Sequence, residues 1–268
     1  MKKITGWYLL TCFGLLLSFT ATAQLDSAGY FSSFDKIKIF YEVKGEGQPI
    51  ILLHGFTGSS NNWRKKPLLD SLLANGFKVV LIDLRGNGNS EKPSGPEGYA
   101  DDAEAKDVMG LMKYLSMGKY TALGYSRGSI ILARVLVKDK NCRRAVIGGM
   151  GTDFTNPQWP RRIGFYNALM NDTIPGYDDF RKYIASQKLD PKTLAWQQKE
   201  QPSTSKEELG KLKQRILVVC GDADEDNGKA GELQKLIPNS KYVTVPGNHN
   251  MAANTPEFAN AVLNFLRE

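Results

Sequence analysis

Histidine and cysteine are scarce in this sequence, whose 268 residues include 2 histidines and 3 cysteines. No group of histidines, cysteines and carboxylates has the spacing of a metal-binding motif, so we expect no metal. A Gly-x-Gly-x-x-Gly dinucleotide motif is also missing, because Glu91 stands where a third glycine would have to follow Gly86 and Gly88. The sequence therefore predicts a protein that works without a cofactor.

Long blocks of charge are absent as well. The formal net charge is +7, but basic and acidic residues are interspersed, and basic clusters such as Arg64-Lys65-Lys66 are short. A nucleic-acid-binding protein would need a basic stripe or a known binding module, and neither is present. We expect no nucleic-acid partner, and nothing in the sequence indicates an oligomeric state. Linkers and internal repeats are missing too, which favours a single domain.

The N-terminus has the pattern of an export signal. Lys2 and Lys3 precede an apolar run, and Ala21-Thr22-Ala23 has the small residues of a cleavage site. The apolar run is short for a transmembrane anchor. We therefore predict a signal peptide over residues 1–23 and a domain over 24–268 that is periplasmic or secreted, with no stable membrane insertion after cleavage.

Two cysteines would remain after that cleavage. Cys142 precedes one predicted strand, whereas Cys220 lies near the end of another. In adjacent parallel strands these positions lie at opposite edges of the sheet, several residues apart at about 3.3 Å per residue, which exceeds the reach of a disulfide. We expect two free thiols.

Apolar runs typical of strands alternate with segments of helical periodicity along the rest of the chain. The predicted strands are 36–45, 49–55, 77–83, 120–123, 143–149, 215–221 and 241–245. The predicted helices are 63–73, 103–115, 130–139, 231–237 and a last one from Thr255 onward. This alternation predicts an α/β fold with a mostly parallel sheet and helices on both faces.

The stretch Leu-Gly-Tyr-Ser-Arg-Gly-Ser at 123–129 places Ser126 between Gly124 and Gly128, where a strand turns into a helix. Such a sharp turn exposes the serine at the carboxyl edge of the sheet, and the glycines avoid collisions with neighbouring backbone. The helix that follows directs its free N–H groups to the same point. We interpret Ser126 as a nucleophile, which requires a base, an acid and an oxyanion site elsewhere.

Residues with catalytic chemistry follow the other predicted strands. They are His54, Asp83, Asp222, Asp224 and His249. Ligands of parallel sheets bind beyond the carboxyl ends of the strands, so these side chains are expected to gather at one edge.

On these motifs the chain resembles the α/β-hydrolase superfamily over nearly all of residues 24–268. The nucleophile, acid and histidine follow the superfamily's order, and a His-Gly turn begins at His54. An Asp-x-Arg-Gly-x-Gly-x-Ser loop runs from Asp83 to Ser90. The resemblance implies a serine ester mechanism, since members that cleave carbon–halogen or epoxide bonds use an aspartate at the position of Ser126.

The resemblance also assigns roles. The base is His249, whereas the other histidine, His54, is structural and orients the oxyanion loop. The acid is Asp224, with Asp222 and Asp153 as alternatives. The oxyanion hole consists of the backbone N–H groups of Phe56 and Arg127, and Asp83 and Arg85 brace their loop.

Residues 151–205 stand where relatives insert a small helical cap, and they are rich in aromatic residues. Some of these rings, such as Trp159 and Phe165, are expected to line an apolar pocket. The sequence thus predicts a carboxylesterase-like serine hydrolase for a small or medium ester, a small-molecule substrate. A lactonase, an amidase, a C–C hydrolase or a cofactor-free perhydrolase could use the same residues. A binding protein without turnover is the alternative from another class.

Overall fold

The computed structural model describes residues 26–171 and 174–268, and the predicted signal peptide, residues 1–23, lies outside them. Eight strands form one sheet in the order β1-β2-β4-β3-β5-β6-β7-β8. The strands are β1 Ser27–Ser32, β2 Lys38–Lys44, β3 Gln48–Leu53, β4 Phe77–Ile82, β5 Tyr120–Tyr125, β6 Cys142–Gly148, β7 Arg215–Gly221 and β8 Ser240–Val245. The pairs from β4 to β8 are parallel, while β1 and β2 are antiparallel to their neighbours.

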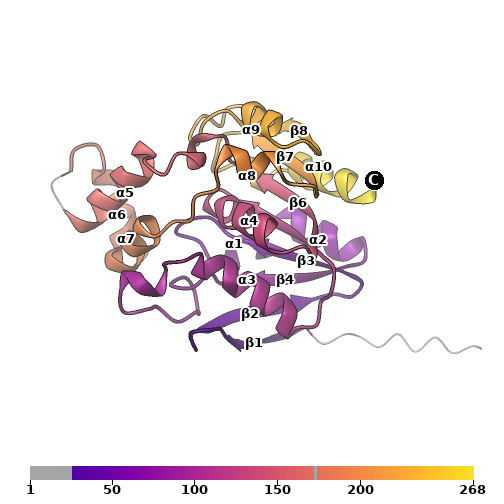
Figure 1. Cartoon of the computed structure of the whole chain (residues 1–268), viewed down its shortest axis with the longest axis horizontal. Helices are drawn as coiled ribbons and strands as arrows, with labels where there is room; N and C mark the ends of the chain where they lie inside the picture. Colours follow the sequence, from indigo (N-terminus) through magenta and orange to yellow (C-terminus); the bar gives the residue numbers. More distant parts are fainter. Residues whose placement is uncertain (1–25, 172–173) are drawn as a thin grey trace, which may run out of the picture.

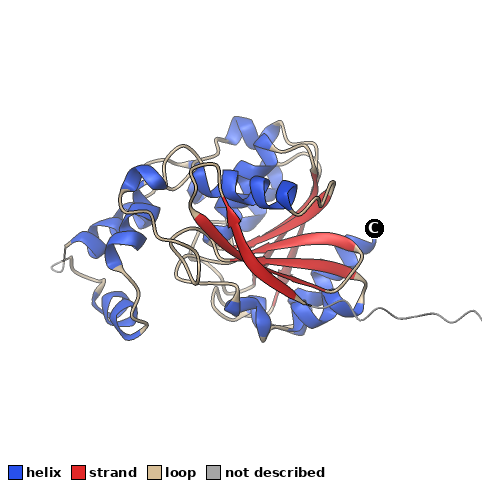
Figure 2. Ribbon diagram, turned by 90° about the horizontal axis from the view of Figure 1, so that it is seen from below, coloured by secondary structure: helices blue, strands red, loops and turns tan. Residues whose placement is uncertain are grey.

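Helices cover both faces of this sheet (Figure 2). On one face pack α3 Ala103–Tyr114, α4 Arg127–Lys138, α8 Lys206–Gly210 and α9 Ala230–Leu236. On the other pack α1 Asn61–Arg64, α2 Pro67–Ala74 and α10 Pro256–Arg267. Alternate residues of β3 pack into the hydrophobic cores on the two faces of the sheet. Ile51 and Leu53 belong to the core beneath α3 and α4, and Ile50 and Leu52 belong to the core beneath α2 and α10. The uninterrupted apolar runs of the sequence therefore produce strands buried on both sides, which confirms the predicted fold class.

The segment between β6 and β7 extends from the sheet as a group of helices (Figure 1). It contains η2 Asp153–Thr155, α5 Pro160–Met170, α6 Asp178–Ser186 and α7 Pro191–Lys199. Its own small core contains Leu169, Ile184, Leu194 and Ala195. Gln197 of α7 joins this segment to the main domain, because its side-chain amide donates to the backbone oxygen of Arg85 at 2.9 Å.

Two features differ from the sequence-based expectation. Strand β1 was not predicted, because this edge strand is mostly exposed and lacks an apolar alternation. The single helix expected over 63–73 is two helices, α1 and α2, with extended backbone at Lys66 (φ −99°, ψ 142°). The ring of Pro67 disfavours the helical conformation for the residue before it, which explains the break.

The cysteines that the structure describes, Cys142 and Cys220, are both free and buried, as predicted. Cys142 begins β6, whereas Cys220 lies near the carboxyl end of β7. Within residues 26–171 and 174–268, no helix combines the length and the apolar character needed to cross a bilayer.

Candidate active site

Ser126 lies between the end of β5 and the start of α4, in a strained backbone conformation (φ 54°, ψ −124°). The flanking glycines permit this turn. A Cβ on Gly124 would lie 2.3 Å from the backbone oxygen of Gly128, and a Cβ on Gly128 would lie 2.4 Å from that of Leu53. A non-glycine residue in such a conformation costs about 1–3 kcal/mol and persists where its surroundings hold it, most often at functional sites.

The structure brings Ser126, His249 and Asp224 together in one hydrogen-bonded series. His249 Nε2 lies 2.9 Å from Ser126 Oγ, and His249 Nδ1 lies 2.9 Å from Asp224 Oδ2. The loop after β8 carries His249, and the turn after β7 carries Asp224. Because Asp224 accepts the Nδ1 proton, Nε2 is free to accept the proton of the Ser126 hydroxyl.

The carboxylate of Asp224 is held ionised by its surroundings. Burial alone would raise its pKa, but the hydrogen bond from His249 lowers it below the ordinary value. Two further donors reach this carboxylate: the Cys220 thiol at 3.3 Å and the backbone N–H of Asp226 at 3.3 Å. Burial also raises the pKa of the Cys220 thiol to about 12, so the thiol remains protonated and donates.

The alternative acids lie elsewhere. Asp222 is exposed, and its Oδ1 accepts a hydrogen bond from the backbone N–H of Gly247 at 2.9 Å. Its role is therefore to hold the loop that precedes His249. For Asp153, the structure gives no hydrogen bond to His249 within the described residues.

His54 is fully engaged in positioning the loop after β3. Its Nε2 accepts from the backbone N–H of Leu84 at 3.0 Å, so its Nδ1 carries the proton that reaches the Gly55 oxygen at 2.8 Å. Complete burial lowers the pKa of His54, which keeps the ring neutral. This arrangement leaves His249 as the histidine beside Ser126.

Backbone N–H groups are available where an oxyanion would form. Arg127 is the first residue of α4, where N–H groups have no acceptor within the helix, and Phe56 lines the same pocket. The Arg127 guanidinium is occupied by Glu104, with which it forms hydrogen bonds of 2.7 and 2.5 Å. The guanidinium is therefore already paired.

Asp83 and Arg85 bind the loops around the site to one another. Asp83 accepts from the backbone N–H groups of Ser60 at 2.6 Å and Asn89 at 2.7 Å. The buried Arg85 forms an ion pair with Asp107 at 2.6 Å. Neither side chain lines the pocket that contains Ser126.

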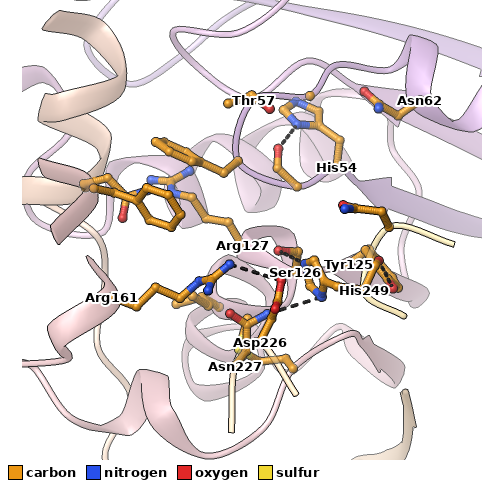
Figure 3. A pocket seen from close by; sticks show the side chains of 18 of the residues that line it. His54, Thr57, Asn62, Tyr125, Ser126, Arg127, Arg161, Asp226, Asn227 and His249 are labelled. Carbon is orange, nitrogen blue, oxygen red and sulfur yellow. Dashed lines mark hydrogen bonds and ion pairs between the residues drawn. The ribbon is translucent and has the colours of Figure 1, made fainter. Parts of the chain in front are cut away.

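The pocket above Ser126 has a volume of about 580 Å³ (Figure 3). In that view His54, Thr57 and Asn62 lie on one side of Ser126 and His249, and Arg161, Asp226 and Asn227 on the other. Three aromatic rings, those of Phe56, Phe165 of α5 and Phe180 of α6, line the pocket. Phe165 lies 5.8 Å from Phe56 and 4.7 Å from Phe180, measured between ring centroids.

Sequence reasoning missed two side chains that contact His249. The Tyr125 hydroxyl donates to the His249 backbone oxygen at 2.7 Å. Asn227 donates to the backbone oxygen of Gly149 at 3.0 Å and lies 3.5 Å from His249 Nδ1. Only the position of Tyr125, next to Ser126 in the sequence, could have indicated its role.

Oxygen and nitrogen atoms of Asp224, Asp226 and His249 lie within 4.8 Å of one another, a spacing that a metal ion could use. Both nitrogens of His249 are already taken by Ser126 and Asp224, and Asp226 pairs with Arg161 at 3.1 Å. These contacts already occupy the atoms that a metal ion would need.

Residues 48–186 match the sequence profile of the alpha/beta hydrolase fold family. The chain is 27% identical over 245 residues to a putative non-heme chloroperoxidase of Synechocystis sp., covering 79% of this chain and 87% of that protein. It is 24% identical over 284 residues to the bifunctional esterase/perhydrolase DCH of Acinetobacter calcoaceticus, covering 89% and 99%. The esterase EaEST of Exiguobacterium antarcticum has a TM-score of 0.75 at 18% identity, over 90% of this chain and 100% of that one. A structural likeness at this identity shows a shared fold.

Proposed function

Because this chain belongs to the α/β-hydrolase family, we propose that it is a serine hydrolase that cleaves small or medium carboxylic esters. The observation that carries this proposal is the hydrogen-bonded series Ser126–His249–Asp224, which begins at a strained turn and opens into a pocket. Neighbours named as esterases and as an esterase/perhydrolase support it.

In the proposed acylation, Ser126 Oγ attacks the ester carbonyl carbon while His249 Nε2 takes the hydroxyl proton. The carbonyl oxygen becomes negative and binds the N–H groups of Phe56 and Arg127, each worth about 3–4 kcal/mol of barrier in comparable sites. Asp224 stabilises the imidazolium that forms. The tetrahedral intermediate then collapses, the C–O bond to the alcohol breaks, and His249 returns the proton to the departing alcohol.

Deacylation repeats these steps with water. His249 takes a proton from water, the hydroxide attacks the acyl carbon, and the bond to Ser126 Oγ breaks as the proton returns to that oxygen. The net reaction consumes one ester and one water and releases one acid and one alcohol. Hydrogen peroxide in place of water would give a peracid, which is the alternative that the related esterase/perhydrolase favours.

A fluorophosphonate probe tests whether Ser126 is an activated nucleophile. We expect one covalent adduct per chain, located on Ser126 by peptide mass spectrometry, because His249 removes the proton of this hydroxyl. A folded protein that binds esters but forms no adduct would be a binding protein. Assays over esters, lactones and amides, with and without hydrogen peroxide, then separate the reactions that share this mechanism.

The pocket volume and its aromatic wall predict a preference for short chains. We expect kcat/KM on p-nitrophenyl esters to be highest between acetate and hexanoate. Phe165→Ala should shift the optimum to longer chains, because it removes one of the aromatic rings that line the pocket. The ratio of kcat/KM for long-chain esters to kcat/KM for short-chain esters should rise by about 3- to 10-fold.

Trp159 provides the matched control for this change. It also lines the pocket, but it is 8% exposed and packs within the main core. Trp159→Ala should therefore lower Tm, on the order of 10 °C, more than it changes the chain-length profile. A profile that rises steadily to palmitate in the wild type would contradict the small-ester proposal and indicate a lipase.

A further inference from the structure

One cation faces the pocket from the break between α1 and α2. Lys66 is the residue that precedes Pro67, and its extended backbone interrupts what would otherwise be a continuous helix. The break places Lys66 among the residues that line the pocket, together with Ser126 and His249. Its neighbour Lys65 is exposed and does not line the pocket.

Two aromatic rings hold the Lys66 ammonium. Its Nζ lies 4.9 Å from the ring centroid of Trp63 and 5.6 Å from that of Tyr125. The Tyr125 ring in turn lies 5.5 Å from the His249 ring, so Lys66 is one aromatic ring away from His249. Cation–π contacts of this kind orient an ammonium group but do not neutralise its charge.

Lys66 differs from the other cations that line the pocket because each of those forms an ion pair with a carboxylate. Arg127 is bound to Glu104, and Arg161 is bound to Asp226. For Lys66, no carboxylate of the described residues lies within ion-pair distance. The remaining ionisable side chains that line the pocket are His54, Tyr125, Tyr183, Asp226 and His249.

A partly buried ammonium without a counter-ion is costly, and an anion entering the pocket would offset that cost. Burial lowers the pKa of Lys66 to about 8, so the group is mostly charged at neutral pH. A second polar group lies in the same wall: Asn62 lines the pocket, and its Oδ1 accepts from the Ser59 backbone N–H at 2.7 Å, which leaves its NH₂ to donate.

We propose that Lys66 binds a carboxylate carried by the substrate, so that the preferred esters are small and anionic. The inference rests on the proposed function and specifies its substrate class. The carboxylate would stand on the acyl or the alcohol part of the ester, whichever lies toward Trp63 and Tyr125 in the bound complex.

Matched ester pairs test this inference. For the acyl side, mono-p-nitrophenyl glutarate is compared with p-nitrophenyl 5-oxohexanoate, which replaces the carboxylate by a neutral acetyl group of similar size. For the alcohol side, 5-acetoxypentanoate is compared with pentyl acetate in a pH-stat. The measured quantity is the ratio of kcat/KM for the anionic ester to kcat/KM for its neutral partner. This ratio should exceed one for the pair whose carboxylate lies on the side of the ester that faces Lys66.

In Lys66→Met, that ratio should fall by about tenfold or more, the loss typical of a charge-assisted hydrogen bond, mainly through KM. Lys66→Arg, which keeps the charge, should retain most of the preference. Lys65→Met removes the same charge from an exposed neighbouring position and should leave the ratio unchanged. In the wild type, the ratio should fall as pH rises through about 8, because Lys66 then loses its proton.

The outcomes separate the two proposals. If neutral esters are hydrolysed but neither pair shows a ratio that depends on Lys66, the anion site is wrong and the esterase proposal stands. If Lys66→Met lowers kcat/KM equally for the anionic and the neutral ester of each pair and also lowers Tm, then Lys66 only packs on Trp63. If no ester of any kind is hydrolysed and Ser126 is not labelled, the proposed function itself fails.

Discussion

Replacing Ser126 with alanine is expected to lower kcat for p-nitrophenyl acetate by a factor on the order of 10⁶, as loss of the nucleophile does in a serine protease. Without Oγ there is no acyl-enzyme, and His249 has no hydroxyl to deprotonate. The variant should keep the wild-type Tm, because the alanine adopts the same backbone conformation and loses only the hydroxyl. A p-nitrophenyl acetate assay with purified protein measures kcat, and a thermal unfolding curve measures Tm.

Ser116→Ala is the control for the backbone. Ser116 has the same positive φ of 54° as Ser126 but is exposed at the end of α3. Any effect of removing a serine hydroxyl at a residue of positive φ would appear in both variants, whereas a loss of chemistry would appear only in Ser126→Ala. Near-wild-type turnover by folded Ser126→Ala protein would overturn the assignment of the nucleophile.

Asp224→Asn is expected to lower kcat by about 10⁴-fold, the loss found when the triad aspartate of a serine protease is changed to asparagine. Asp224 Oδ2 accepts the Nδ1 proton of His249 at 2.9 Å. An asparagine amide would donate toward Nδ1, shift the ring proton to Nε2, and leave no acceptor for the Ser126 hydroxyl.

Asp222→Asn is the matched comparison two residues away. Asp222 is exposed, and the asparagine oxygen can still accept from the Gly247 backbone N–H, so kcat should change only a fewfold. If Asp222→Asn proves the more damaging of the two, the roles assigned to this turn are reversed.

The carboxyl-edge residues could be predicted because their positions follow from local rules. Continuous apolar runs such as that of β3 form strands buried on both faces, and parallel strands bring their carboxyl ends to one edge. The glycines on either side of Ser126 predict a sharp turn from the sequence alone. Strand β1 escaped prediction because its residues carry little apolar signal, and its pairing with β2 forms it.

The sequence by itself determined that an α/β sheet would present Ser126 on a strand-to-helix turn, and the family resemblance assigned His249 and not His54 as the base. Only the tertiary structure decided that His249, 123 residues away along the chain, lies 2.9 Å from that serine and that His54 is buried between two backbone groups. It also showed the contact with His249 that distinguishes Asp224, the acid assigned by the family resemblance, from Asp222, and it placed Lys66 in the pocket. These outcomes depend on how loops from distant strands pack at one edge of the sheet. Contacts between residues so far apart in the chain cannot be read from local sequence patterns.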